Sequence, residues 1–175
     1  MAYDDIQLSF IERFFRSAVQ HYNHEKYWRY RAIVIDPDRG TRLGDLFRLF
    51  YIKRADAFNN ASMGTHRNFG AKFATPPILP HGLNGIIVTH NAEIGENCII
   101  FHQSTIGEGS NGAPIIGNNV LIGAGAKVIG GIKIGNHVKI GSGCVVTTDI
   151  PDYATVVAEK NRIFLHSNSN PAEEE

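Results

Sequence analysis

The chain has 175 residues with 17 basic and 17 acidic side chains, so it has no basic excess with which to follow nucleic-acid phosphates. It contains no apolar run of 18 residues, and its acidic start does not resemble a secretory signal. Its two cysteines have no motif spacing, which is typical of a reducing compartment. We therefore expect a cytoplasmic protein with no nucleic-acid partner and no membrane insertion.

Residues 1–58 predict an N-terminal helical cap. Apolar side chains recur at three- and four-residue spacing over 5–22, and a second helical stretch covers roughly 24–34. The segment Asp-Pro-Asp-Arg-Gly at 36–40 has the composition of a turn, and a third helical pattern follows over 42–58. We expect these helices to close one end of the domain that follows.

Residues 59–165 form the second predicted domain, which has no clean period over 59–85 and carries a six-residue repeat from residue 88 onward. A β-branched aliphatic residue recurs every six positions, with one longer interval: Val88, Ile94, Ile100, Ile106, Ile116, Ile122, Val128, Ile134, Ile140 and Val146. A small or aliphatic residue lies two positions before each of the last nine, and such positions point to the same side of a strand. Each hexad therefore predicts a short strand with two inward side chains and then a corner, as in a parallel β-helix. The recurring glycines exclude a long α-helix.

The longer interval, between Ile106 and Ile116, contains four extra residues within the segment GEGSNGAP (107–114). We expect it to project from the solenoid as a loop, since surface insertions cost little closure entropy. The final segment, 166–175, is polar and acidic and predicts a disordered tail.

The repeat resembles that of the hexapeptide-repeat acyltransferases over roughly residues 60–165. The resemblance implies a mainly β fold, a left-handed parallel β-helix of hexapeptide repeats with three hexads per coil and an N-terminal α-helical cap. With three hexads in each coil, Ile122 would stack on Ile140. The resemblance also implies a homotrimer with active sites between its subunits.

Within that family, the segment containing LPHGLNG and IGAGAK is most similar to serine acetyltransferases, and His81 falls on the catalytic histidine. Pro80 replaces the family's aspartate beside that histidine, and Ala113-Pro114 replaces a His-Pro pair. In the family these groups help to hold serine. The segment AKFATPP (71–77) is similar to sequences connected with surface polysaccharides. We therefore expect a sugar hydroxyl as the acceptor, with L-serine as the alternative.

A second alignment points to another histidine. The segment VTHNAEIGEN (88–97) resembles the histidine segment of acetyltransferases that act on nucleotide sugars, in which the histidine is the base. His90 is therefore a second candidate for the catalytic base beside His81. Histidine as a residue type titrates near neutrality, which suits it to take the proton of a hydroxyl group.

The resemblance implies acetyl-CoA as co-substrate, direct transfer in a ternary complex and no metal. Ala124 and Ser142 are three hexads apart and would share one face, where the family's backbone groups hold the pantetheine arm. A glycine-rich loop can also supply an N–H for the oxyanion. Seven residues are expected to contact the coenzyme: Gly107, Ala124, Ser142, Thr147, Thr148, Lys160 and Arg162.

Two other functions fit a solenoid of this kind. A γ-type carbonic anhydrase needs three zinc-binding histidines, two of them spaced H-x4-H, and the sequence has no such pair. A non-catalytic interaction module would use only the solenoid surface and would not bind coenzyme A. Cys98 and Cys144 occupy inward positions of the repeat, which predicts packed, unreactive thiols.

Overall fold

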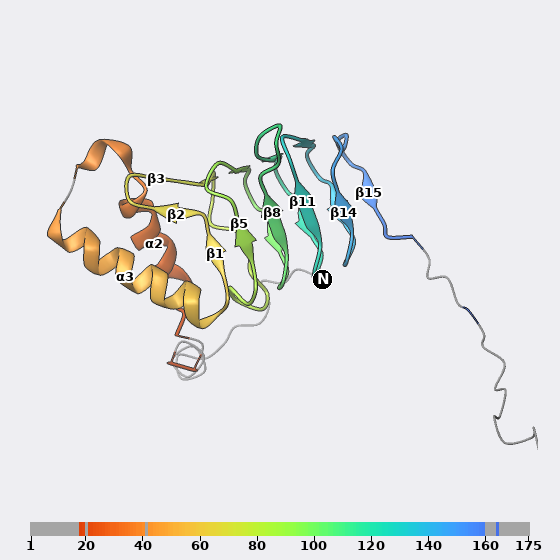
Figure 1. Ribbon diagram of the computed structural model, residues 1–175. Coiled ribbons are helices and arrows are strands. Elements are labelled where there is room, and N and C mark those ends of the chain that lie inside the picture. The colour runs from red at the N-terminus through yellow and green to blue at the C-terminus, as the bar shows by residue number, and fades with distance from the viewer. Residues whose placement is uncertain (1–17, 20, 41, 160–163, 165–175) are drawn as a thin grey trace, which may run out of the picture.

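The computed structural model of the chain describes residues 18–19, 21–40, 42–159 and 164. Helices α2 (His24–Val34) and α3 (Leu43–Phe58), joined by the 3-10 helix η2 (Pro37–Arg39), lie at one end of a stack of short strands (Figure 1). The predicted mainly β fold, a parallel β-helix with N-terminal helices, is confirmed. The predicted tail and most of the predicted helix over 5–22 lie outside the described residues.

The strands form three parallel sheets, which are the three faces of a prism. The first sheet contains β1 (Ser62–Met63), β5 (Ile87–Val88), β8 (Thr105–Gly107), β11 (Lys127–Ile129) and β14 (Val145–Val146). The second contains β4 (Lys72–Phe73), β6 (Glu93–Ile94), β9 (Ile115–Ile116) and β12 (Lys133–Ile134). The third contains β7 (Ile99–Ile100), β10 (Leu121–Ile122), β13 (Lys139–Ile140) and β15 (Thr155–Val156). A short antiparallel hairpin, β2 (Thr65–His66) and β3 (Phe69–Gly70), leaves the first coil.

The strand pairing confirms a coil of three hexads. Ile122 pairs with Ile140, and Ile116 pairs with Ile134, so each partner lies three hexads further along the chain. Across the longer interval the offset grows by the four inserted residues, as in the pairing of Thr105 with Lys127. These extra residues are therefore expelled at a corner, and the strands on either side keep their pairing.

The inward positions of the repeat form the core. All ten recurring aliphatic residues from Val88 to Val146 are at most 3% exposed. Burying each such side chain contributes roughly 1.5–3 kcal/mol. Cys98 and Cys144 are buried and unpaired, and burial raises the pKa of the Cys98 thiol, which disfavours the reactive thiolate. The prediction that both are packed thiols is consistent with this burial.

A buried guanidinium joins the helical cap to the first coil. Arg31, on α2, is 2% exposed and donates hydrogen bonds to the carbonyl oxygens of Met63 and Ala71 and to the Thr65 hydroxyl. Its guanidinium also lies over the ring of Phe73, 4.8 Å from the centroid. Burial lowers the pKa of Arg31 to about 10, so it stays charged at neutral pH. Arg31 thereby satisfies carbonyl groups that the end of the solenoid would otherwise leave unpaired.

A second buried polar contact joins the two helices of the cap. The Tyr27 hydroxyl donates to Asp56 Oδ1 over 2.6 Å, and burial raises the pKa of Asp56 to about 6. Asp56 Oδ2 is buried without a hydrogen-bond partner in the described part of the chain. Keeping this carboxylate ionised is therefore costly for the folded state.

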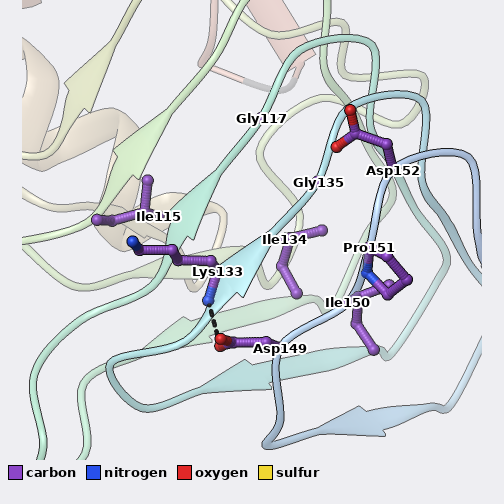
Figure 2. Close-up of a pocket in the computed structure, with 9 residues that line it drawn as sticks. All are labelled: Ile115, Gly117, Lys133, Ile134, Gly135, Asp149, Ile150, Pro151 and Asp152. Atoms are coloured by element: carbon purple, nitrogen blue, oxygen red, sulfur yellow. Dashed lines mark hydrogen bonds between the residues drawn. The ribbon is translucent and has the colours of Figure 1, made fainter.

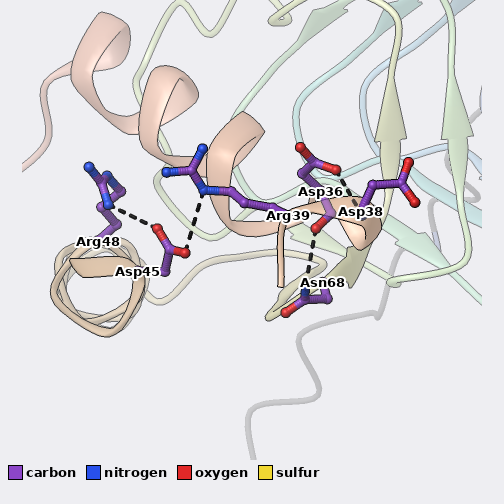
Figure 3. A network of polar contacts seen from close by, with 6 residues as sticks. All are labelled: Asp36, Asp38, Arg39, Asp45, Arg48 and Asn68. Atoms are coloured by element: carbon purple, nitrogen blue, oxygen red, sulfur yellow. Dashed lines mark hydrogen bonds and ion pairs between the residues drawn. The ribbon is translucent and has the colours of Figure 1, made fainter. Parts of the chain in front are cut away.

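Polar contacts on the outside of the cap hold η2 in place (Figure 3). The Asp45 carboxylate forms ion pairs with Arg48 at 2.9 Å and Arg39 at 3.5 Å. Asn68 Nδ2, from the β2–β3 hairpin, donates to the backbone oxygen of Asp36 over 3.1 Å. These contacts link α3 and the connection between the helices to the first coil. The Asp45 side chain is only 4% exposed, so its two ion pairs are partly buried.

Candidate active site

One edge of the prism, the histidine corner, contains the segments that lead from the third sheet to the first: 80–85, 101–103, 123–125 and 141–143. A backbone ladder aligns them. Gln103, Gly125 and Gly143 donate their N–H groups to the carbonyl oxygens of Asn84, His102 and Ala124 over 2.9, 3.0 and 2.9 Å. The turn that holds His81, then His102, Ala124 and Ser142, therefore follow one another along the prism axis.

Two imidazoles meet at the first two levels of this corner. His81 is exposed, and its ring centroid lies 4.8 Å from that of His102, with the planes at 89°. Phe101, which precedes His102 in the segment 101–103, also contacts His81, and their ring centroids are 5.9 Å apart. His102 Nδ1 is buried and has no hydrogen-bond partner among the residues that the structure describes. The structure thus adds a second histidine beside the predicted base.

The sequence analysis did not single out His102 as a site residue, although a signal was present. The offset from His81 to His102 is the same as that from Ile78 to Ile99, which pair with each other. The turn at 80–85 makes the first coil longer than three hexads. Residues compared at a spacing of three hexads therefore do not match His81 with His102.

The next two levels of the histidine corner carry only small residues. Ala124 is partly exposed and Ser142 is exposed, each flanked by glycines. Gly125 and Gly143 have φ values of +70° and +71°, and none of the described residues lies within 4 Å of a Cβ placed on either. Beyond the two histidines, the corner is therefore a narrow strip of accessible backbone.

A different edge of the prism, the loop corner, contains the segments that lead from the first sheet to the second: 64–71, 89–91, 108–113, 130–131 and 147–149. His90, Thr147 and Thr148 lie here, and Gly107 ends the strand that enters it. Within one chain, the structure brings His81, Ala124 and Ser142 together and separates them from these residues. Lys160 and Arg162 lie outside the described residues.

His90 is surrounded differently from His81. Its ring centroid lies 5.5 Å from that of His66 and 5.0 Å from that of Phe69, both on the β2–β3 hairpin. The hairpin is seated closely on this coil, since a Cβ on Gly64 would lie 3.0 Å from the Cα of His90 and 2.8 Å from the oxygen of Thr89. His90 is partly buried as a result.

The projecting loop is tied to the coils on both sides of it. Glu108 accepts hydrogen bonds from the Thr89 hydroxyl at 3.2 Å and from Asn91 Nδ2 at 3.0 Å. Asn111 Oδ1 accepts from the N–H of Gly131 over 2.9 Å, and a Cβ on Gly131 would collide with the Asn111 backbone. The predicted projection is confirmed, and the loop folds back on the loop corner.

A shallow pocket of about 510 Å³ lies elsewhere, at the C-terminal end of the second sheet (Figure 2). It is lined by Ile115, Gly117, Lys133, Ile134, Gly135, Asp149, Ile150, Pro151 and Asp152. It contains no histidine and none of the predicted site residues. It has no imidazole, and its two carboxylates already accept backbone hydrogen bonds, Asp149 from Lys133 N–H and Asp152 from Asn136 N–H. We therefore place the candidate active site at the histidine corner.

Across the described ranges, no three His, Cys, Asp or Glu side chains gather as a metal site would require. In the same ranges, no helix has the length and apolar composition needed to cross a membrane.

Comparison with known proteins identifies relatives of this architecture. The model of the bacterial transferase hexapeptide family (six repeats) matches residues 113–148. The serine acetyltransferase of Mycobacterium tuberculosis is 32% identical over 148 residues, which are 82% of this chain and 61% of that protein. The serine acetyltransferase of Synechococcus elongatus is 37% identical over 102 residues, which are 56% of this chain and 41% of that protein. The chain thus spans between 41% and 61% of these two curated relatives.

Solved structures agree with this comparison. The serine acetyltransferase of Brucella abortus in complex with coenzyme A has a TM-score of 0.58 and 26% identity, over 86% of this chain and 55% of that one. The serine acetyltransferase of Neisseria gonorrhoeae in complex with serine has a TM-score of 0.56 and 32% identity, over 65% of this chain and 46% of that one.

Proposed function

Because this chain belongs to the hexapeptide-repeat transferases, we propose that it transfers the acetyl group of acetyl-CoA to a hydroxyl group and that its acceptor is L-serine. The relatives support L-serine, the alternative of the sequence analysis, better than the sugar hydroxyl expected there. One observation carries the proposal. The exposed His81 lies on the same corner as the small-residue strip of Ala124 and Ser142, so a base and a path for a slender co-substrate adjoin.

In this mechanism His81 removes the proton from the serine hydroxyl as its oxygen attacks the thioester carbonyl. A tetrahedral intermediate forms, with negative charge on the former carbonyl oxygen, which backbone N–H groups can stabilise. The carbon–sulfur bond then breaks, and the protonated imidazole returns the proton to the departing sulfur. The products are O-acetylserine and coenzyme A, and the side chains remain unchanged.

The contrast between the two histidines supports His81 as the base. His81 is exposed beside the strip, whereas His90 is partly buried against His66 and Phe69. A base needs its nitrogen within hydrogen-bond reach of the acceptor hydroxyl, which favours the exposed ring.

The coenzyme would lie along the strip, with backbone groups around Ala124 and Ser142 holding its pantetheine arm. Gly107, Thr147 and Thr148 lie on the loop corner, so within one chain they are separated from this path. We infer that they reach the coenzyme from a neighbouring subunit of a homotrimer. Phosphate contacts by Lys160 and Arg162 and a cytoplasmic location stay predictions.

The proposal is tested by measuring free thiol released from acetyl-CoA by the purified protein, with and without L-serine. We expect serine-dependent release. Release with sugars or nucleotide sugars, but not with serine, would support an acetyltransferase with a different acceptor. Pro80 and Ala113, which replace groups that hold serine in the family, would then explain the loss of serine as the acceptor. Failure to bind coenzyme A in calorimetry would contradict the transferase and favour a non-catalytic module.

A further inference from the structure

We propose that His102 is a positioning residue for His81, and that His102 Nδ1 accepts a hydrogen bond from the His81 imidazole during turnover. The inference rests on the proposed function, because it gives His102 a role only through the base. It concerns a residue that carries none of the predicted coenzyme or acceptor contacts.

The distance between the two rings suits such a bond. Their centroids are 4.8 Å apart. A linear N–H···N hydrogen bond of about 2.9 Å between two imidazoles places the centroids roughly 5 Å apart. The observed separation is therefore compatible with such a bond, which a rotation of the exposed His81 side chain would form. Catalytic hydrogen bonds are commonly loose before substrates bind and tighten in the complex.

The His102 ring supplies a nitrogen that is unpaired in the described part of the chain and is an acceptor in the tautomer that carries its proton on Nε2. Its Nδ1 atom is buried without a hydrogen-bond partner among the described residues. The neighbouring Ser104 hydroxyl lies against the carbonyl oxygens of Phe101 and Gly123, at 2.8 and 3.1 Å. Buried polar nitrogens are rarely left unpaired, because losing their hydrogen bonds to water is costly. A rotated His81 would pair this atom and remove that cost.

A base of this type works best when a third group fixes its orientation. In the described part of the chain, no carboxylate is hydrogen-bonded to either imidazole, and the side chain of Pro80 has no hydrogen-bonding atom. A bond from one His81 nitrogen to His102 would fix the tautomer, so that the other nitrogen presents its lone pair to the acceptor hydroxyl. The bond would also strengthen when His81 becomes protonated, since charge-assisted bonds are the stronger ones.

Three replacements of His102 test this role, with L-serine and acetyl-CoA as substrates. His102→Phe keeps a flat ring but has no acceptor, and we expect kcat to fall about 10- to 100-fold, with KM for acetyl-CoA changed less than about twofold. His102→Asn places an amide oxygen as many bonds from the backbone as Nδ1, and we expect it to restore part of the loss. His102→Gln places that oxygen one bond further out and should restore less. Full activity in His102→Phe would overturn the proposal.

A double-mutant cycle separates positioning from a structural role. In a His81→Ala background, His102→Phe should cause almost no further loss, because the residue acts through His81. Additive losses, or equal losses in all three variants with a matching fall in melting temperature, would mean that His102 only supports the fold.

A measurement without turnover separates failure of this inference from failure of the proposed function. In protein labelled with ¹⁵N-histidine and saturated with coenzyme A, the His102 Nδ1 resonance should show a hydrogen-bonded acceptor, and His81→Ala should abolish that shift. Serine-dependent turnover by the wild-type protein without this shift would refute the histidine pair and leave the transferase intact. The shift without serine-dependent turnover would refute L-serine as the acetyl acceptor and leave the His81–His102 hydrogen bond intact.

Discussion

Each coil of the prism turns several corners, and two of these corners differ in how they use the chain. At the histidine corner, three residues connect the strands in most coils, and the last two levels contain only alanine, serine and glycine. At the loop corner, the first coil extends into the β2–β3 hairpin and the third projects the loop at 107–114. Repetition thus keeps the last two levels of the histidine corner open and uniform, while insertions give the loop corner its individual side chains.

The largest expected difference between the corners is catalytic. His81→Ala should lower serine-dependent turnover about 100- to 10,000-fold, because it removes the proposed general base. His90→Ala should change turnover less than about fivefold, since that ring packs against His66 and Phe69. Steady-state kinetics on both variants, with melting curves as the control for folding, decides the matter. The reverse pattern would move the active site to the loop corner.

The buried Asp56 in the helical cap should make the stability of the protein depend on pH. Burial raises the pKa of Asp56 to about 6, above its ordinary value of 3.8, so the folded state holds this proton more tightly than the unfolded state. The free energy of unfolding should therefore fall as pH rises from about 4 to about 6. This contribution is at most roughly 3 kcal/mol and should be constant above that range.

The variant Asp56→Asn keeps an oxygen for the Tyr27 hydroxyl and should lose this part of the pH dependence. Urea unfolding of both proteins at pH 4 and pH 7 measures it as a difference between the two. Parallel curves would show that Asp56 does not titrate within this range. Activity at pH 7 should stay within about twofold of the wild type, because the residue lies in the cap.

Coenzyme affinity should also distinguish the corners. Ser142→Trp fills the small-residue strip, and we expect the Kd for coenzyme A to rise about 10-fold or more, since overfilling a closely fitted site typically costs 1–3 kcal/mol. Thr147→Trp, an exposed replacement of equal final bulk on the loop corner, should have a smaller effect. Isothermal titration calorimetry compares the two. Equal losses would mean that both corners line the coenzyme path to the same degree.

The smallest expected effects concern hydrogen bonds at the two corners. Ser104 is fully buried beside the histidine corner and its hydroxyl lies against two carbonyl oxygens, so Ser104→Ala should cost about 1 kcal/mol of unfolding free energy. Glu108 accepts its hydrogen bonds at the exposed loop corner, and Glu108→Ala should cost less than about 0.5 kcal/mol. Denaturant unfolding would contradict this ranking if Glu108→Ala proved the more damaging.

Much of the solenoid could be predicted from sequence because its period is imposed on every coil. The recurrence from Val88 to Val146 predicts which side chains are inward, and the four extra residues before Ile116 predict a projecting loop. The stretch at 24–34 likewise predicts α2, which begins behind the Asn23 cap. These features depend on local spacing, which a single sequence contains.

The grouping of the site residues depends on the irregular coils, and the sequence predicted it less well. Ala124 and Ser142 share a corner because three hexads separate them, as expected. The contact between His81 and His102 depends on the long turn at 80–85, which breaks that spacing. The burial of Arg31 and Asp56 depends on how two helices meet the first coil, so no periodicity indicates it.

The ladder of backbone hydrogen bonds along the histidine corner fixes the distance between the His81 turn and Ser142. Neighbouring strands in a sheet are about 4.8 Å apart, so the steps from the His81 turn through His102 and Ala124 to Ser142 span roughly 14 Å. That length is set by the number of coils and is almost independent of the side chains. Insertion or removal of a three-hexad coil between His102 and Ser142 would change the distance from the His81 turn to Ser142 by one strand spacing. Changes in the loops at the loop corner would leave that distance unaltered.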